Sequence, residues 1–307
     1  MLGSQADACT QLLTQLVQFL SEKRKEPLVP IAPEAYVSLL GLPPLGDLVS
    51  VYGVPPAIAF HISRPALRAS ITRAPSRAGK GAKEEEKGRD AAAADAAAAL
   101  LAPWAHDSAE LRAAVRAVLP DAAWSSMTPA LYQAFWSYSL YDLKVPKERY
   151  QHQMKRALAT VERLKKPLPK EEDTTEGRRE RRAELKAAQV AYPAVKEELA
   201  AQNRNHAFVM ERFEAAKDAF FPPGAAAAEE KTGASSLALL RHCVLPRIML
   251  SPGDALYCAR FVALLHANDT PGFSTIAYYN AALKTAITMC ICLSEREAAH
   301  LGIFLCE

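Results

Sequence analysis

The chain has 307 residues, half of them hydrophobic, and its 37 Lys and Arg nearly balance its 34 Asp and Glu, giving a net charge of +3. This composition supports a sizeable core and excludes an overall basic field that would attract nucleic acid. Six scattered cysteines lack the density of a secreted disulfide framework, so reduced and mostly buried thiols are expected. No run of about 18 apolar residues occurs, so no membrane span or membrane partner is expected.

Residues 1–72 are predicted to form short helices. Apolar residues recur at spacings of three and four from Leu12 to Leu20 with no basic region before them, which predicts an amphipathic helix and not a signal peptide. Prolines between Pro27 and Pro44 prevent long helices after it. The next helix should start at Pro55-Pro56 and end or kink at Pro65.

Residues 73–103 are predicted to be a disordered linker, because this Ala-rich and charged stretch has almost no large apolar side chain to bury. Order is expected to return at residues 104–146, a helical segment. There Thr128 should cap a helix with Pro129 in its first turn. That helix is apolar on most sides, so it is expected to be buried.

Residues 147–220 are predicted to form a charged, coiled-coil-like helical arm with a loop near 166–178. A heptad pattern follows the loop, and it favours packing against another helix of the same chain. The seam consists of Leu185, Tyr192, Leu199, His206 and Phe213, followed at three-residue offsets by Ala188, Val195, Gln202, Val209 and Ala216. Pro193 lies inside this helix and should kink or divide it.

Residues 221–236 are predicted to be a second Ala-rich linker, and residues 237–307 the start of a truncated helical-repeat domain. A first helix should be interrupted at Pro246. Ser251 should then cap a helix that stops by Asn268, where turn-forming residues follow.

Two more helices complete this block. One is predicted from about Ser274 to Cys292, and the next starts with a capping box formed by Ser294 and Glu297. The chain reaches Glu307 without a helix stop signal, so a fragment of a longer protein is expected. The predicted fold class is all-α: α-solenoid-like helical repeats with a long charged arm and disordered Ala-rich linkers.

The cysteines and histidines do not predict a metal or redox site. Cys258 and His266 lie eight residues apart on one helix, which separates them by about 12 Å along its axis. Cys290 and Cys292 point to opposite sides of a helix, and no CxxC turn occurs. A tertiary zinc site joining Cys243, Cys258 and a later cysteine stays as an alternative. Phosphate-binding, hydrolase and metalloprotease motifs are also absent, so neither an enzyme nor a cofactor is predicted.

A basic patch in the arm is the one candidate nucleic-acid contact. It consists of Lys165, Lys166, Arg178, Arg179, Arg181 and Arg182. Mobile cations of this kind contact phosphates. Acidic residues are interleaved between positions 171 and 180, however, and a mixed charge run is typical of a solvated surface. Direct RNA binding through residues 163–186 is therefore the alternative hypothesis.

Several long strings resemble the THO complex subunit 2 family of scaffold proteins. In residues 237–307 these are the Pro-Arg pair at 246–247, DALYCARFV at 254–262 and TPGFST at 270–275. Two upstream strings agree in order: DLVSVYGVPPAIAFHISRP and MTPALYQAFWSYSLYDLKVPKERY. The likeness covers roughly residues 46–72, 124–164 and 237–307, somewhat under half of the chain.

The resemblance implies a nuclear, largely helical-repeat scaffold in the complex that couples transcription to mRNA export. It implies other THO subunits as partners, a DEAD-box RNA helicase reached through the complex, and mRNA reached indirectly. The signature helix is then a packing element without catalytic residues: Asp254, Ala255, Tyr257, Cys258, Ala259, Arg260, Phe261 and Val262. Burial is expected for Ala255, Cys258, Ala259 and Val262. The matched pieces lie mid-chain in the family, so the family's basic nucleic-acid-binding tail is absent from this sequence.

Overall fold

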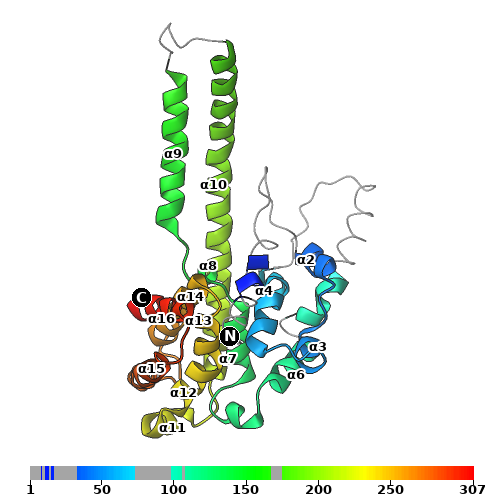
Figure 1. Cartoon of the computed structure of the whole chain (residues 1–307), viewed down its shortest axis with the longest axis vertical. Coiled ribbons are helices and arrows are strands. Elements are labelled where there is room, and N and C mark those ends of the chain that lie inside the picture. The colour runs from blue at the N-terminus through cyan, green and yellow to red at the C-terminus, as the bar shows by residue number, and fades with distance from the viewer. Residues whose placement is uncertain are drawn as a thin grey trace. The chain divides into compact units, whose positions relative to one another are not determined.

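The computed structural model describes residues 8, 11–13, 15–16, 33–72, 98–105, 108–166 and 175–307. These residues form helices and no strand, which confirms the predicted all-α class (Figure 1). The chain divides into two compact units: residues 1–140 together with 211–307, and residues 141–210. Among the described helices, none is long and apolar enough to cross a bilayer.

The first unit begins with helices that come from the N-terminal part of the chain. They are α2 (Pro33–Leu40), α3 (Leu45–Ser50), α4 (Pro56–Thr72), η1 (Ala102–Trp104), α6 (Ala109–Val118), η2 (Asp121–Ser125) and α7 (Pro129–Ser137). In this part α2 packs on α4, α3 on α6, and α4 on α7. Most of the predicted N-terminal helix and residues 73–97 of the linker predicted at 73–103 lie outside the described residues. Residues 98–103 are helical and Leu101 is buried, so the predicted linker is wrong there.

The C-terminal part of the chain supplies the other helices of the first unit. They are the end of α10 from residue 211, η3 (Lys217–Ala219), α11 (Ala225–Thr232), α12 (Ala234–Leu239), η4 (Leu240–Val244), α13 (Leu245–Ile248), α14 (Pro252–Ala267), α15 (Thr275–Met289) and α16 (Glu295–Cys306). Here α14 packs on α13 and α16, and α15 packs on α12.

An aromatic cluster forms the core of the first unit and joins both parts of the chain. α7 is buried along its whole length from Leu131 to Ser137, as its apolar sequence predicts. Phe135 of α7 makes edge contacts with Tyr257 and Phe261 of α14, at ring-centroid distances of 5.5 and 5.0 Å. Such offset aromatic pairs contribute about 0.5–1.5 kcal/mol beyond the area that they bury.

The three helix starts that the sequence predicts are confirmed by their caps. The side chains of Thr128, Ser251 and Ser294 each accept a hydrogen bond from the backbone N–H three residues later. Ser294 and Glu297 complete the reciprocal capping box. Thr128 also donates to the carbonyl of Phe220 at 2.9 Å, so its hydroxyl ties α7 to the chain that follows η3.

Prolines interrupt the helices less than the sequence predicts. α4 continues through Pro65 to Thr72, and α10 continues through Pro193. At Pro246 the helical path of α12 and α13 continues by way of η4, a π-helical turn. A proline ring collides with the carbonyl four residues earlier, and a wider π turn gives it room.

The stretch expected to be a linker at residues 221–236 contains helix α11 instead. Gly224 and Gly233 bound this helix with positive φ angles of 81° and 64°, a conformation that glycine adopts without steric cost. The carboxylate of Glu229 is buried and accepts a hydrogen bond from the backbone N–H of Ser235 at 2.7 Å, which caps α12. Because the stretch is rich in alanine, its composition did not indicate this buried cap.

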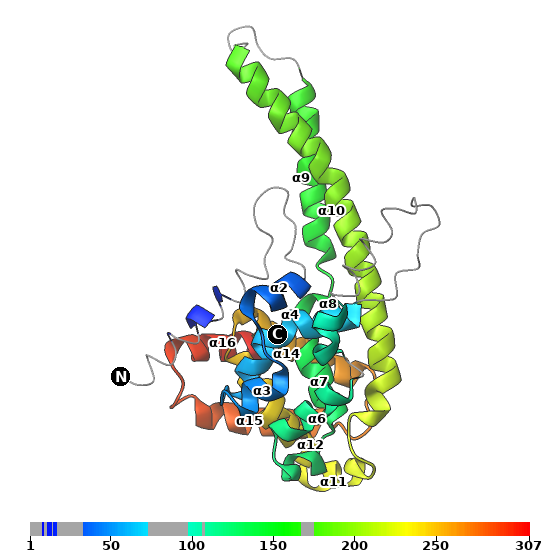
Figure 2. The same cartoon turned by 90° about the vertical axis from the view of Figure 1, so that its right-hand side faces the viewer.

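The second unit is the charged arm, a hairpin of two helices (Figures 1 and 2). α8 (Leu140–Leu143) leads to α9 (Lys147–Lys165), which runs beside α10 (Thr175–Ala216) in the opposite direction. The heptad positions of α10 from Leu185 to Val209 are buried or half-buried in this hairpin. Of the loop expected near 166–178, residues 167–174 lie outside the described residues.

Candidate functional site: a buried arginine–aspartate centre

A buried ion pair joins α13 to the start of α14. The side chain of Arg247 is fully buried, and its Nε donates to Oδ1 of Asp254 at 2.9 Å. Asp254 lies in the first turn of α14, where the hydroxyl of Ser251 donates to its Oδ2 at 2.8 Å. The positive end of the helix dipole further favours a carboxylate at this position.

The same arginine caps the C-terminal end of α7. Its Nη2 donates to the carbonyl of Tyr138 at 2.8 Å, and its Nη1 donates to the carbonyl of Phe135. The hydroxyl of Tyr257 donates to the same Phe135 carbonyl at 2.8 Å, and the Tyr257 ring lies 3.5 Å from the guanidinium carbon. Carbonyls at the end of a helix need donors, and a buried cation there also matches the dipole.

This capping explains a difference from the predicted helix. The sequence after Pro129 has no helix-stopping residue before the Val145-Pro146 pair, so it favours one helix up to that pair, but the structure ends α7 at Ser137 and starts α8 at Leu140. Tyr138 between them is extended, with φ −80° and ψ 155°. Its carbonyl thereby turns toward Arg247, so the break follows from a tertiary contact.

A second arginine reaches the same carboxylate from α4. Nη1 of Arg64 lies 2.8 Å from Oδ1 of Asp254, so two guanidinium groups share one acidic partner. We call Arg64, Arg247 and Asp254 the polar centre. His61, one turn before Arg64, is buried beside it, and neither ring nitrogen has a hydrogen-bond partner.

Burial and charge shift the pKa values of the groups in this region. Burial raises the pKa of the Asp254 carboxyl, but the guanidinium groups of Arg64 and Arg247 outweigh it and hold that pKa well below its usual value. Burial, with the nearby charge of Arg64, lowers the pKa of His61 to about 4. Burial raises the pKa of the Tyr257 phenol. Near neutral pH the centre therefore holds an ionised Asp254 and a neutral His61.

The cysteines near the centre are buried in helix packing. Cys243 and Cys258 are fully buried, and burial raises the pKa of both thiols. The thiol of Cys258 donates to the carbonyl of Val244 at 3.7 Å, whereas the ring of His266 hydrogen-bonds to Thr275 on the exposed side. In the part of the chain that the structure describes, no three metal-binding side chains converge on one point.

The signature helix is positioned by these contacts. Ala255, Cys258 and Val262 are buried, as the sequence predicts, while Ala259 is half-buried. The larger members Asp254, Tyr257 and Phe261 are buried too and make the polar and aromatic contacts. Arg260 points elsewhere and forms an ion pair with Glu307 near the end of α16.

The predicted basic patch of the arm does not form one cluster of free cations. Arg181 is half-buried and donates from Nε to the carbonyl of Leu164 at 3.0 Å, so it caps α9. The other members are exposed on α9, α10 or the turn after α9: Lys165, Lys166, Arg178, Arg179 and Arg182. The direct RNA-binding alternative is therefore not favoured.

Sequence reasoning missed Arg64 and Arg247 as partners of Asp254. Each is a lone charged residue inside an apolar string, AFHISRPAL and CVLPRIML, and an isolated charge of this kind indicates a buried pair. The sequence contains no signal that these two strings meet, because they lie more than 180 residues apart.

Comparison with known proteins assigns the second of these strings, with the helices around it, to a family. The model of the Tho2 family, described as Transcription factor/nuclear export subunit protein 2, matches residues 124–307, which include Arg247 and Asp254. The chain is also similar over its full length to THO complex subunit 2 of Arabidopsis thaliana (29% identical over 318 residues) and of Homo sapiens (26% identical over 310 residues). It spans 16% and 18% of those two proteins. No solved structure matches.

Proposed function

Because the chain belongs to the Tho2 family of transcription factor/nuclear export subunit proteins, we propose that it is a scaffold segment of a THO complex subunit. In this role it couples transcription to mRNA packaging and nuclear export without a catalytic step of its own. The observation that carries the proposal is the match of residues 124–307 to the family, over the same helices that the polar centre holds together.

The geometry supports a packing role for the signature helix. Its carboxylate Asp254 faces two guanidinium groups, and one of these, from Arg247, also caps α7. A buried carboxylate held ionised by two arginines is unsuited to general acid or base chemistry near neutral pH. Such a centre instead fixes how helices from distant parts of the chain pack, which a scaffold requires.

We further propose the partners and the location of this segment. Other THO subunits bind it directly, a DEAD-box RNA helicase is reached through the assembled complex, and mRNA is reached indirectly. The segment acts in the nucleus. These assignments are supported by the names of the relatives, THO complex subunit 2.

Affinity purification of the tagged chain from nuclear extract tests the proposal. Recovery of other THO subunits, retained after RNase treatment, is the expected result, because the scaffold role requires protein contacts. A matched sample carrying Asp254→Asn should recover less of them, since loss of the carboxylate disturbs helix packing. Recovery of no THO subunit by the folded wild-type chain contradicts the proposal.

A further inference from the structure

A stripe of exposed apolar side chains runs along α15 and into the turn after it. Its members recur at spacings of three and four, so they share one face of the helix. They are Ile276, Tyr279, Leu283, Ile287 and Ile291, which are between 54% and 90% exposed. A neighbouring face of α15, about 100° around the helix, is buried through Tyr278, Ala282 and Ala286. This double-sided apolar pattern is typical of a helix with a second packing partner.

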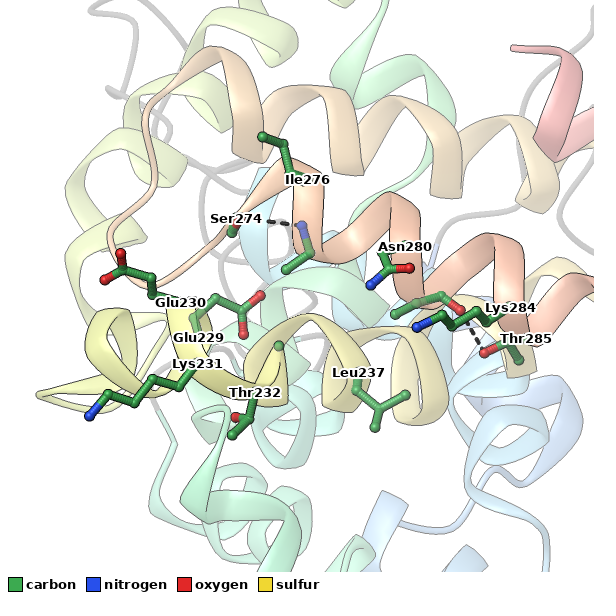
Figure 3. A pocket seen from close by; sticks show the side chains of 13 residues that line it. Glu229, Glu230, Lys231, Thr232, Leu237, Ser274, Ile276, Asn280, Lys284 and Thr285 are labelled. Atoms are coloured by element: carbon green, nitrogen blue, oxygen red, sulfur yellow. Dashed lines mark hydrogen bonds between the residues drawn. The ribbon is translucent and has the colours of Figure 1, made fainter.

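The stripe borders a groove that α15 forms with α11 and α12 (Figure 3). Leu237 and Thr232 line it from one side, and Ile276, Asn280 and Lys284 line it from α15. In Figure 3 the side chains of Asn280 and Lys284 lie along the groove beside α12, the helix that contains Leu237. A groove parallel to an apolar helix stripe fits another helix, because apolar side chains at spacings of three and four insert along it.

Positive charge predominates along this groove. Lys231 and Lys284 line it, and exposed Arg241 follows Leu237 by four residues, about one helical turn onward. None of these three cations forms an ion pair with a described residue. Glu230 is the one exposed acidic side chain in the lining, since Glu229 is buried against the start of α12. A partner with acidic residues beside its apolar face therefore complements the groove.

A second copy of the chain fits this face poorly. Two-fold pairing of the stripe with itself would centre near Leu283, and residues next to the two-fold axis would then meet their own counterparts in the other copy. Lys284, adjacent to the centre, would face the Lys284 of that copy, and like charges at an interface weaken association. The charge pattern thus favours a different, acidic partner.

We infer that the groove between α15 and α11–α12 is a docking site for an amphipathic helix of another THO subunit, with acidic residues flanking its apolar face. This inference rests on the proposed function and assigns it a surface. The apolar stripe supplies the contact area, and Lys284, Lys231 and Arg241 select the partner by charge.

Photo-crosslinking of the 307-residue chain, purified together with the other THO subunits, tests the inference. Benzoylphenylalanine at Leu283 should crosslink to one subunit, and mass spectrometry should map the site to an acidic amphipathic helix. The same probe at Val51, an exposed apolar residue away from the groove, is the matched control and should not give that product.

Substitutions then distinguish the contribution of the apolar contact to partner binding from the contribution of charge. Leu283→Glu should reduce recovery of the crosslinked subunit at least tenfold, whereas Leu39→Glu, at a somewhat more exposed position on α2, should leave recovery unchanged. Lys284→Glu should reduce recovery severalfold and Lys284→Arg should preserve it. Helix content by circular dichroism must stay the same in all four variants, because these side chains are exposed.

Three crosslinking results would overturn the inference: a crosslink to a second copy, to another part of this polypeptide, or to RNA. Equal recovery of every subunit by the Leu283→Glu variant and by wild type would overturn it as well. In these cases the wild-type chain still recovers THO subunits, so the proposed function stands. Recovery of no subunit by wild type overturns the proposed function and the docking site with it.

Discussion

Nη1 of Arg64 lies 2.8 Å from Oδ1 of Asp254, and this ion pair joins α4 to α14 across 190 positions of sequence. Arg247 binds the same oxygen atom from α13 and caps α7, so the centre joins four helices, α4, α7, α13 and α14. The two strings that resemble the family, around Arg64 and around Asp254, are thus parts of one packing centre.

Removing the charge of Asp254 should destabilise the first unit strongly. Asp254→Asn leaves two buried guanidinium groups without a counter-charge, and breaking a buried pair in this way costs about 3–5 kcal/mol of unfolding free energy. Urea denaturation followed by circular dichroism measures the change. Asp218→Asn, at an exposed position in η3, is the control and should change stability by less than about 0.5 kcal/mol. Equal effects of both substitutions would contradict the assigned role.

His61 should make stability depend on pH between about 6.5 and 4. Its pKa is lowered to about 4 in the folded chain, so over this range the unfolded chain binds a proton that the folded chain does not. Stability must therefore fall as the pH falls through this window, by about 3 kcal/mol in total. The contribution of Asp254, whose pKa is lowered, is lost only at still lower pH, below about 4.

His61→Leu tests this dependence directly. Leucine cannot take up a proton, and it has no ring nitrogens that are buried without a hydrogen-bond partner. The variant should therefore be more stable than wild type at pH 5, and the difference in unfolding free energy should become smaller toward pH 7.5. Unfolding free energies at several pH values give the comparison. His242 and His300 retain some dependence, because burial lowers the pKa of each. Parallel pH profiles of variant and wild type would exclude His61 as a source.

The carboxylate of Glu229 should contribute to folding stability, whereas the carboxylate of the neighbouring Glu230 should not. Glu229 is buried and accepts hydrogen bonds from the backbone N–H groups of Ser235 and Ser236, at 2.7 and 3.2 Å. Glu229→Gln weakens this cap of α12 and should cost about 1–2 kcal/mol. Glu230→Gln changes an exposed side chain one position away and should be nearly neutral by the same urea measurement. Equal stability of the two variants would show that α12 does not depend on this cap.

Replacement of glycine by alanine should destabilise the fold more at Gly272 than at Gly41. Both have positive φ, 81° and 54°, so alanine strains the backbone at either position. A Cβ at Gly272 would also lie 2.8 Å from the Cβ of Phe221, whereas a Cβ at Gly41 would meet nothing within 4 Å. We expect about 1 kcal/mol of destabilisation for Gly41→Ala and clearly more for Gly272→Ala, measured by thermal unfolding. The reverse order would refute the close packing at Gly272.

Arg181 should hold the arm hairpin closed although its charged neighbours do not. Its guanidinium donates to the carbonyl of Leu164 and to those of Arg163 and Lys166 at the end of α9. Arg181→Ala should raise amide hydrogen exchange in the last turn of α9 severalfold, because these carbonyls lose a donor. Arg182→Ala, at an exposed position, should leave exchange unchanged. Identical exchange in both variants would contradict the capping role.

Local signals in the sequence predicted the helices and their starts. Ser251, Thr128 and Ser294 cap the helices that their positions indicate, since an N-cap depends only on residues within one turn. The apolar spacing of α7 predicted its burial, and the heptad pattern predicted which residues of α10 between Leu185 and Val209 are buried or half-buried. The departure was at Pro246, where a π turn keeps the helical path that the sequence predicted to be interrupted, while Pro65 and Pro193 do not end or divide their helices.

By itself, the sequence determined the all-α class, the helix caps and the buried signature helix, because these follow from periodicity and from contacts a few residues apart. Only the tertiary structure decided that Arg64 and Arg247 share Asp254, that α7 ends where Arg247 binds its carbonyls, and that α11 replaces an expected linker. The first two features depend on residues that lie far apart in sequence, and local patterns contain no information about which distant segments meet. In α11 the local composition, rich in alanine, did not indicate the buried carboxylate of Glu229 that caps α12.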